Sequence, residues 1–318
     1  MHKRLVNHCT ITLKIIPQGP ILIKSGKEGA DPTKPDMEFV ETYHPGGRSI
    51  YLPGSSLRGA IRAHAERIVR TVGKDKRPED PNTLWANDPL KDNYKYLENK
   101  TPAEIYRLSS FTDRIFGNTS LASRLRIEDA HPVDTTTLKL EERNGVAIDR
   151  VFGSTVPGAL FNFQVCTGGE FSTKIHLKNF TLAQLGLIGL VLRDLDDGWF
   201  GLGFAKSRGL GTVAVNLENA MVQYPGCVTD TDNNRIKLLG SDQTWPDTTL
   251  LGAGMFLDKE LCEKYGFPED DEKETNIKVT EMDLGLGVQL TWDGDEQVKT
   301  LFNRAVKAWI KRIEKVAA

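Results

Sequence analysis

Apolar and polar side chains alternate near the start of the chain. Within residues 5–15, Cys9, Ile11 and Leu13 recur at every second position, with polar residues between them. A period of two is typical of a β-strand with one buried face. A Pro-Gln-Gly-Pro turn then leads to a second short apolar run, Ile21–Lys24, which we expect to be extended.

A hairpin and a long helix are predicted next. Residues 36–43 and 48–52 flank a His-Pro-Gly-Gly turn, which favours a β-hairpin. After Pro53 the apolar spacing changes to that of an amphipathic helix. Its predicted buried face consists of Leu57, Ile61, Ile68 and Val72.

Later segments continue this alternation of strands and helices. We expect strands at 124–130, 160–165, 171–177 and 212–217, and helices at 101–109 and 182–195. Thr101 with Glu104, and Thr181 with Gln184, predict capping boxes at the starts of these two helices. Thr167-Gly-Gly predicts that the two middle strands form a hairpin. The helix 182–195 is apolar on nearly all sides and must be buried. The pattern indicates an α+β fold, a split βαβ sheet with helices on one face.

Domain organisation follows from changes in composition. The 318 residues allow one large domain or two modest ones. We predict a core at 1–225, interrupted by a polar surface insertion at 73–100 and a long charged insertion at 131–158. Residues 226–318 form a C-terminal extension that ends in an amphipathic helix. We expect this extension to pack on the core or on a neighbouring subunit.

Composition describes a soluble globular chain, 39% hydrophobic and 26% charged. A net charge of −2 argues against nucleic-acid binding over the whole surface, but it leaves room for a local basic groove. We expect no membrane segment, because no apolar run approaches the required length. The first residues lack the pattern of a signal peptide, and the four cysteines are scattered, so we expect a cytoplasmic protein.

The start of the helix after Pro53 is the first candidate site. We expect Ser55 or Ser56 to cap it, and its N-terminus carries partial positive charge that suits an anion. Arg58 and Arg62 lie four residues apart and therefore on one face. Together these residues predict a phosphate-binding site. A capped helix with solvated arginines would show the same pattern.

The glycine-rich loop 201–211 is the second candidate. Its glycines, Gly209 and Gly211 among them, permit close approach of a ligand, and Lys206, Ser207 and Arg208 supply polar and cationic groups. The loop lacks the G-K-[ST] ending of a Walker motif, and it precedes a strand, unlike a dinucleotide fingerprint. We predict phosphate or nucleic-acid binding. A tight turn is the alternative.

Two aspartates mark a third candidate. Asp31 lies in a loop rich in Gly, Pro and charge, and Asp36 follows that loop. A loop aspartate can ligate a divalent cation or help to activate a 2′-hydroxyl, or it can simply be solvated. The histidines show no metal-ligand spacing, and His44 is the one that we would test.

Several motifs occur in the order found in a known family. They are Leu52-Pro-Gly-Ser-Ser-Leu-Arg-Gly59, Ile115-Phe-Gly117, Ser123-Arg-Leu-Arg-Ile-Glu-Asp-Ala130, Ile148-Asp-Arg150, Gly158-Ala-Leu-Phe161 and Gly201–Gly211. Over residues 5–217 the chain resembles the RAMP superfamily of CRISPR effector proteins. It looks most like the repeating backbone subunit of type III effector complexes.

The resemblance implies a ferredoxin-like (RRM-like) core with insertions and partners of several kinds. Such subunits stack along a CRISPR RNA, beside other RAMP subunits and the large subunit, and engage target RNA. The RNA-binding residues would be Ser55, Ser56, Arg58, Arg62, Lys206, Ser207, Arg208, Gly209 and Gly211. The insertion 131–158, with Arg150, matches the family's thumb-like hairpin between guide and target.

The resemblance also implies chemistry. In catalytic relatives an aspartate after the first strand cleaves target RNA with a divalent metal, and Asp36 matches its position best, with Asp31 second. Asp36 would hold Mg²⁺. Two departures, the long C-terminal extension and the extra residues around Asp36, leave a non-catalytic scaffold open. A CRISPR RNA-processing endoribonuclease with a histidine base is a further alternative.

Overall fold

The computed structural model describes residues 4–26, 35–45, 47–88, 94–230 and 232–317. The main antiparallel sheet runs, in spatial order, through β15 (Thr280–Glu281), β16 (Val288–Asp293), β9 (Val213–Tyr224), β1 (His8–Pro17), β8 (Phe171–Lys178) and β4 (Leu125–Ile127), with β5 (His131–Pro132) also paired to β8. The helices are α1 (Gly54–Val72), α2 (Pro102–Leu108), α3 (Asp113–Phe116), α4 (Leu182–Asp196), α5 (Lys259–Tyr265) and α6 (Asp295–Ala317).

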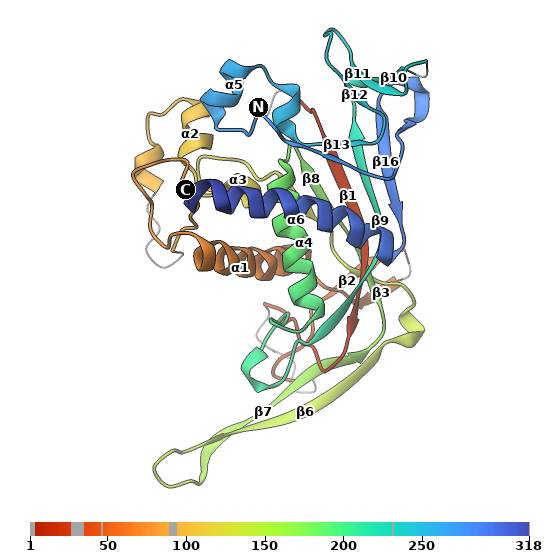
Figure 1. Ribbon diagram of the computed structural model, residues 1–318. Coiled ribbons are helices and arrows are strands. Elements are labelled where there is room, and N and C mark those ends of the chain that lie inside the picture. Colours follow the sequence, from red (N-terminus) through yellow and green to blue (C-terminus); the bar gives the residue numbers. More distant parts are fainter. Residues whose placement is uncertain (1–3, 27–34, 46, 89–93, 231, 318) are drawn as a thin grey trace.

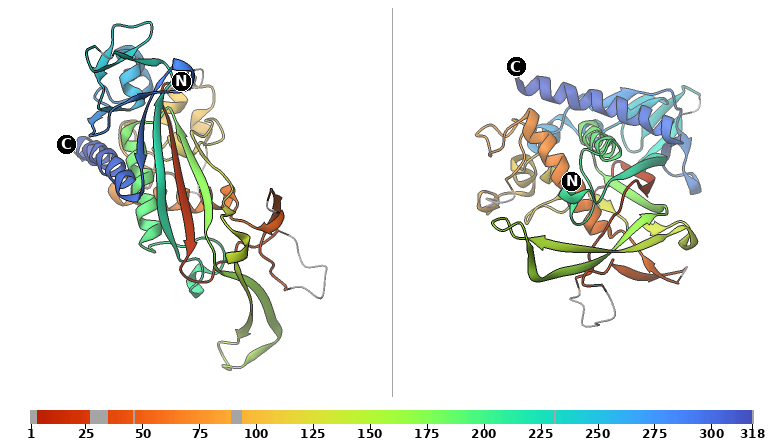
Figure 2. Two further views of the ribbon diagram at one scale, coloured as in Figure 1. Left: turned by 90° about the vertical axis from the view of Figure 1, so that its right-hand side faces the viewer. Right: turned by 90° about the horizontal axis from the view of Figure 1, so that it is seen from below.

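The central part of this sheet has ferredoxin-like connectivity. The chain runs through β1, α1, β4, β8, α4 and β9, while the strands lie in the order β9-β1-β8-β4. The helices α1, α4 and α6 cover one face of the sheet (Figure 1, Figure 2). The burial of β1 alternates strictly, because Cys9, Ile11, Leu13 and Ile15 face the helices, while the residues between them face away. The predicted α+β class is confirmed.

The C-terminal extension belongs to the same sheet and core. The strand β16 pairs with β9, and α6 packs against α4 and β9. Trp292 and Trp309 are buried in the main hydrophobic core. The helices α4 and α6 approach closely at Gly186, where an added Cβ would lie 2.5 Å from the Ala305 carbonyl oxygen. Of the two expectations for the extension, packing on the core is confirmed.

A long hairpin arm, β6 (Lys139–Ile148) and β7 (Thr155–Gly168), projects from the body (Figure 1). The prediction that 160–165 pairs with 171–177 is wrong, because β7 pairs with β6, whereas β8 pairs with β1 and β4. Alternation identifies each segment as a strand but does not specify its partner. The chain turns a corner at Gly169 and passes from the arm into the sheet.

Smaller elements surround the core. The remaining pairings are β2 (Glu41–His44) with β3 (Gly47–Ile50), β10 (Cys227–Asp230) with β11 (Arg235–Leu238) and β12 (Thr244–Pro246), and β13 (Thr249–Leu251) with β14 (Glu272–Glu274). The capping boxes predicted at Thr101 and Thr181 are both present. From the polar segment 73–100, Leu84 and Trp85 are buried against the body.

Candidate nucleic-acid interface

The start of α1 is capped from outside the helix. The prediction of a serine cap is wrong, because the N-cap residue is Pro53 and no side-chain cap bond is present there. Instead the Gly54 N–H donates to Asp129 Oδ1 at 2.7 Å. Gly54 packs so tightly on β4 that a Cβ would lie 2.3 Å from the Ile127 carbonyl oxygen. The Asp129 carboxylate therefore already occupies part of the positive field at this helix end.

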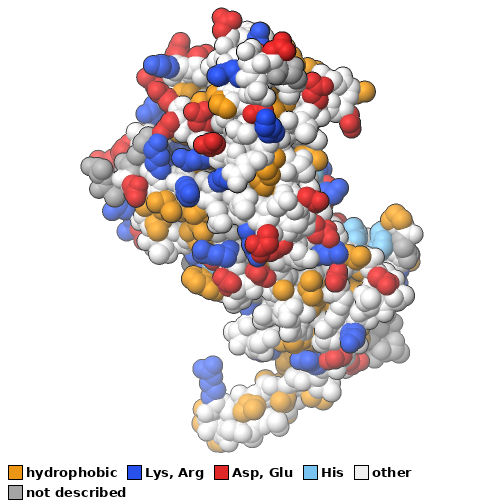
Figure 3. Space-filling view, turned by 45° about the vertical axis from the view of Figure 1, so that its right-hand side comes forward, with side chains coloured by type: hydrophobic (Ala, Val, Ile, Leu, Met, Phe, Trp, Pro, Cys, Tyr) orange, Lys and Arg blue, Asp and Glu red, His pale blue; other side chains and the backbone are white. Residues whose placement is uncertain are grey.

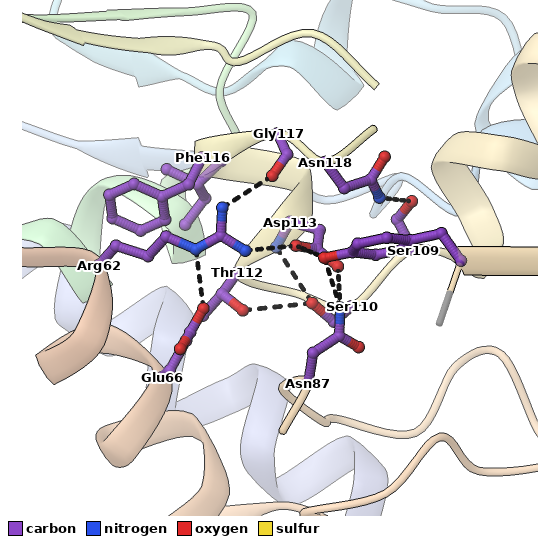
Figure 4. Close-up of polar contacts among 12 residues, drawn as sticks. Arg62, Glu66, Asn87, Ser109, Ser110, Thr112, Asp113, Phe116, Gly117 and Asn118 are labelled. Atoms are coloured by element: carbon purple, nitrogen blue, oxygen red, sulfur yellow. Dashed lines mark hydrogen bonds and ion pairs between the residues drawn. The ribbon is translucent and has the colours of Figure 1, made fainter. Parts of the chain in front are cut away.

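Arg62 is held by protein groups on three sides (Figure 4). Its Nε donates to Glu66 at 2.8 Å, its Nη1 to the Gly117 carbonyl at 3.0 Å and its Nη2 to Asp113 at 2.9 Å. Although burial lowers the pKa of Arg62, the bonds and charges of Glu66 and Asp113 raise it overall. We assign Arg62 a positioning role that ties α1 to α3.

Arg58 makes a similar internal contact. It donates to the carbonyl of Phe116, the last residue of α3. Burial, followed by the neighbouring charge of Arg62, lowers the pKa of Arg58. Both arginines therefore donate to carbonyl groups at the C-terminal end of α3, a role that the spacing of two basic residues did not indicate.

In the first two turns of α1, the exposed positions carry small side chains. Ser55, Ser56 and Gly59 are all exposed and lie on one side of the first two turns. A Cβ added to Gly59 would meet nothing within 4 Å. A polymer backbone can thus approach this helix closely. The sequence pattern identified the two serines, but Gly59 was missed because a helical glycine alone gives no functional signal.

The glycine-rich loop presents its polar residues to solvent. Lys206, Ser207, Arg208 and Gly209 are exposed on a single 3₁₀ turn, η3 (Lys206–Arg208). The turn is bounded by left-handed residues, Ala205 at φ 55° and Gly209 at φ 83°. This loop brings cationic groups and open backbone together, the combination that suits phosphate.

Two glycines let the loop pack against neighbouring backbone. A Cβ at Gly203 would lie 2.2 Å from the Leu22 carbonyl oxygen, and one at Gly211 would lie 2.2 Å from that of Leu202. Phe204 N–H donates to this Leu22 carbonyl at 2.7 Å. The glycines at 203 and 211 are thus needed for the shape of the loop, while Gly209 lies at its exposed surface.

The arm carries apolar side chains in solvent. At its tip Val151 is 83% exposed and Phe152 is 84% exposed, next to the exposed Arg150. Figure 3 shows hydrophobic side chains along the arm. Asp149 Oδ1 accepts from the N–H groups of Val151 at 2.8 Å and Phe152 at 2.9 Å, and these bonds lower the pKa of Asp149. The tip is therefore an ordered turn, and its exposed apolar surface is typical of an interaction site.

Asp36 is exposed at the base of the arm. Its Oδ2 accepts from the Asn162 N–H of β7 at 2.9 Å, and the Asn162 side chain donates to Glu142 Oε1 at 3.0 Å. Within the described residues no group of three or more His, Cys, Asp or Glu side chains could hold a metal ion. Mg²⁺ often takes only one or two carboxylates and completes its shell with phosphate and water. Asp36 is one such exposed carboxylate, and Asp31 lies outside the described residues.

A short ladder joins the loop, Asp36 and the arm. Ile21 pairs with Cys166 of β7, and Lys24 pairs with Phe39. Met37 N–H donates to the Asn162 carbonyl at 3.2 Å. Residues 21–24, which we expected as a strand, form these isolated bridges. They place the glycine-rich loop, Asp36 and the arm on one continuous surface, and the arm projects from that end of the body (Figure 2).

Two histidines lie together near the same region. The ring centroids of His44 and His131 are 5.0 Å apart, and Tyr51 stacks on His131 at 5.9 Å. The sequence indicated His44 but not His131, which comes from β5, far away in the chain. Histidine is the side chain that most often acts as a general acid or base.

Comparisons with known proteins agree with this geometry. No curated protein matches the chain. No helix in the described ranges is long and apolar enough to cross a membrane. A family model, the RAMP superfamily, matches residues 14–214. That span runs from within β1 to the first residues of β9, and it includes the arm and the glycine-rich loop. It exceeds half of the sequence, so the chain belongs to the RAMP superfamily, which is associated with CRISPR-related RNA binding.

Proposed function

We propose that the protein is an RNA-binding backbone subunit of a type III CRISPR effector complex. The guide RNA backbone would lie over Ser55, Ser56 and Gly59 of α1 and beside Lys206 and Arg208 of the loop. Small side chains allow the sugar-phosphate chain to approach, and the cations neutralise phosphates.

The exposed apolar tip of the arm carries this proposal. A soluble protein rarely keeps two large side chains such as Val151 and Phe152 more than four-fifths exposed on a projecting turn without a partner. Inserted between paired bases, these side chains would replace stacking contacts, while Arg150 meets a phosphate. The arm would thus wedge between guide and target.

Asp36 is proposed to cleave the target RNA at that wedge. The reaction is attack of a 2′-hydroxyl on the adjacent phosphate, with the 5′-oxygen leaving. When bound, Mg²⁺ supplies charge stabilisation at the phosphate. Asp36 would hold the ion through its Oδ1, because its Oδ2 accepts the Asn162 N–H.

Asp36→Asn tests the chemistry with little change in shape. An asparagine oxygen still accepts the Asn162 N–H, whereas the charge is lost. In the assembled complex with target RNA and Mg²⁺, we expect cleavage to fall by at least about a hundredfold while target binding is retained. Glu142→Gln is the matched control, because it removes the other carboxylate that accepts a hydrogen bond from Asn162. Unchanged cleavage in Asp36→Asn would leave a scaffold role for this subunit.

The histidine pair favours a second candidate, metal-independent RNA processing. The ring centroids of His44 and His131 are 5.0 Å apart. One ring would act as the base that deprotonates a 2′-hydroxyl, and the other as the acid that protonates the leaving oxygen. This activity would persist in EDTA, show a bell-shaped pH profile and disappear in His131→Gln. Cleavage that requires Mg²⁺ and is indifferent to His131→Gln would exclude it.

A further inference from the structure

A cavity of about 710 Å³ opens in the helical layer, away from the RNA-binding surface. It lies between α2, α5, the start of α4 and the end of α6, at the opposite end of the body from the arm (Figure 1). We call it the arginine pocket, after Arg107, Arg114 and Arg312, which line it. Its volume is in the range that holds a small-molecule ligand.

The arginines of this pocket form no salt bridge among the residues that the structure describes, although the charge of Asp80 acts on Arg312. Arg114 is only 6% exposed, and it donates to the backbone carbonyls of Ser109 at 3.1 Å and Arg107 at 2.6 Å. Arg312 likewise donates to a backbone carbonyl, that of Asn82, at 3.0 Å. Buried guanidinium groups are normally paired with an anion.

Positive charge is concentrated further by neighbours. Burial, together with the charges of Arg312, Arg124 and Arg107, lowers the pKa of Arg114 to about 10, against the opposing effect of Tyr106. Nε of Arg107 is buried without a hydrogen-bond partner in the described part of the chain, whereas Arg124 lies outside the lining and over the Tyr106 ring at 4.2 Å. An orphaned donor such as the Arg107 Nε indicates a missing acceptor.

The carboxylates of the pocket offset this charge only in part. Asp271 is buried, accepting from the N–H groups of Leu182 at 2.9 Å and Gly254 at 3.2 Å, and burial raises its pKa to about 7. Glu263 and Glu269 are exposed at the rim, and Asp270 there pairs with Lys311. Five cationic side chains therefore line the pocket against four carboxylates.

An aromatic wall completes the pocket. Tyr106 and Phe267 stack with centroids 5.2 Å apart at an interplanar angle of 7°, and Phe111 lines the cavity beside them. Planar guanidinium groups match the oxygens of phosphate, and flat apolar walls accept a ring. We propose that the arginine pocket binds a small ligand that combines a phosphate with a planar heterocycle, the chemistry of a nucleotide.

Calorimetric titration of the full chain with AMP and with inorganic phosphate tests this proposal. We expect saturable AMP binding that is about tenfold tighter than phosphate binding, because only AMP uses the aromatic wall. Arg107→Gln with Arg312→Gln should weaken AMP binding by about tenfold or more. Lys174→Gln with Lys178→Gln, two exposed positions on β8 outside the pocket, removes the same charge elsewhere and should leave AMP binding unchanged.

Three outcomes of the titrations with AMP and phosphate would overturn it. They are no saturable heat with either probe, equal binding of phosphate and AMP (an adventitious anion only), and AMP binding unaffected by the arginine substitutions. A loss of binding to single-stranded RNA, rather than to AMP, in the arginine variant would also refute it. Should the double variant fail to fold, Arg312→Lys keeps the charge but removes the planar fork, and it should still weaken AMP binding.

Discussion

Replacing Lys206 and Arg208 with alanine should reduce the salt dependence of RNA binding. Both side chains are exposed on η3, and neither forms an ion pair among the residues that the structure describes, so their loss should leave the free energy of unfolding within about 0.5 kcal/mol of wild type. Arg208 lies over the Phe204 ring at 5.6 Å, a contact too exposed to change this expectation.

The magnitude follows from counterion release. Each phosphate contact on a single strand contributes about 0.7 to the slope of log affinity against log salt, so two contacts contribute about 1.4. Between about 50 and about 200 mM salt, wild type should therefore lose about sevenfold more affinity than the double variant. Fluorescence anisotropy with a labelled repeat-derived RNA measures both slopes.

A second double variant serves as the control for the change in salt slope. Lys259→Ala with Lys264→Ala removes the same two charges from α5, at the other end of the molecule (Figure 1). Its salt slope should match that of wild type, apart from the small effect of net charge. If the loop variant keeps the wild-type slope, or if the α5 variant loses as much, the loop does not contact phosphate and the proposed RNA path is wrong.

Three further predictions concern single positions. Gly59→Ala should stabilise α1 by about 1 kcal/mol in urea unfolding, because its Cβ meets nothing, yet it should weaken RNA binding if the backbone passes over it. Gly186→Ala should destabilise the fold by about 1–3 kcal/mol, because its Cβ would lie 2.5 Å from the Ala305 carbonyl oxygen, and an unchanged urea midpoint would contradict this packing. Burial raises the pKa of Asp271 to about 7, so the native state binds the proton more tightly than the unfolded chain does. The free energy of unfolding should therefore fall as pH rises from about 4 to 7, and Asp271→Asn should remove this pH dependence.

Local pattern predicted those parts of the fold that local forces determine. The strand at β1, the extent of α1 and the capping boxes at Thr101 and Thr181 depend on side-chain period and on residues three positions apart. These features were all correct. The predicted apolar stripe of α1 was less accurate, since Leu57 and Ile61 are buried but Val72 is 43% exposed at the helix end.

Long-range partners could not be predicted in the same way. Asp129 caps a helix that begins 75 residues earlier, and Asp113 pairs with Arg62 across 51 residues. The exposed face of a helical arginine looks the same in sequence whether it meets solvent, RNA or another part of the chain. The partner of β7 was assigned wrongly for the same reason, because strand period carries no information about which strand lies beside it.

The charge balance of the chain bears on how such a subunit would hold RNA. Because the net charge is −2, RNA binding would rely on a few local cations. Arg58 and Arg62 already donate to groups of α3, so Lys206 and Arg208 are the cations that would contact phosphates. Two or three phosphate contacts give weak binding at physiological salt. Repetition along one guide would convert such weak contacts into stable assembly, because each added subunit binds at the high effective concentration set by its neighbour. Isolated protein should therefore bind short RNA poorly, and affinity should rise steeply once the RNA is long enough for two copies; an affinity independent of RNA length would argue against a stacked backbone subunit.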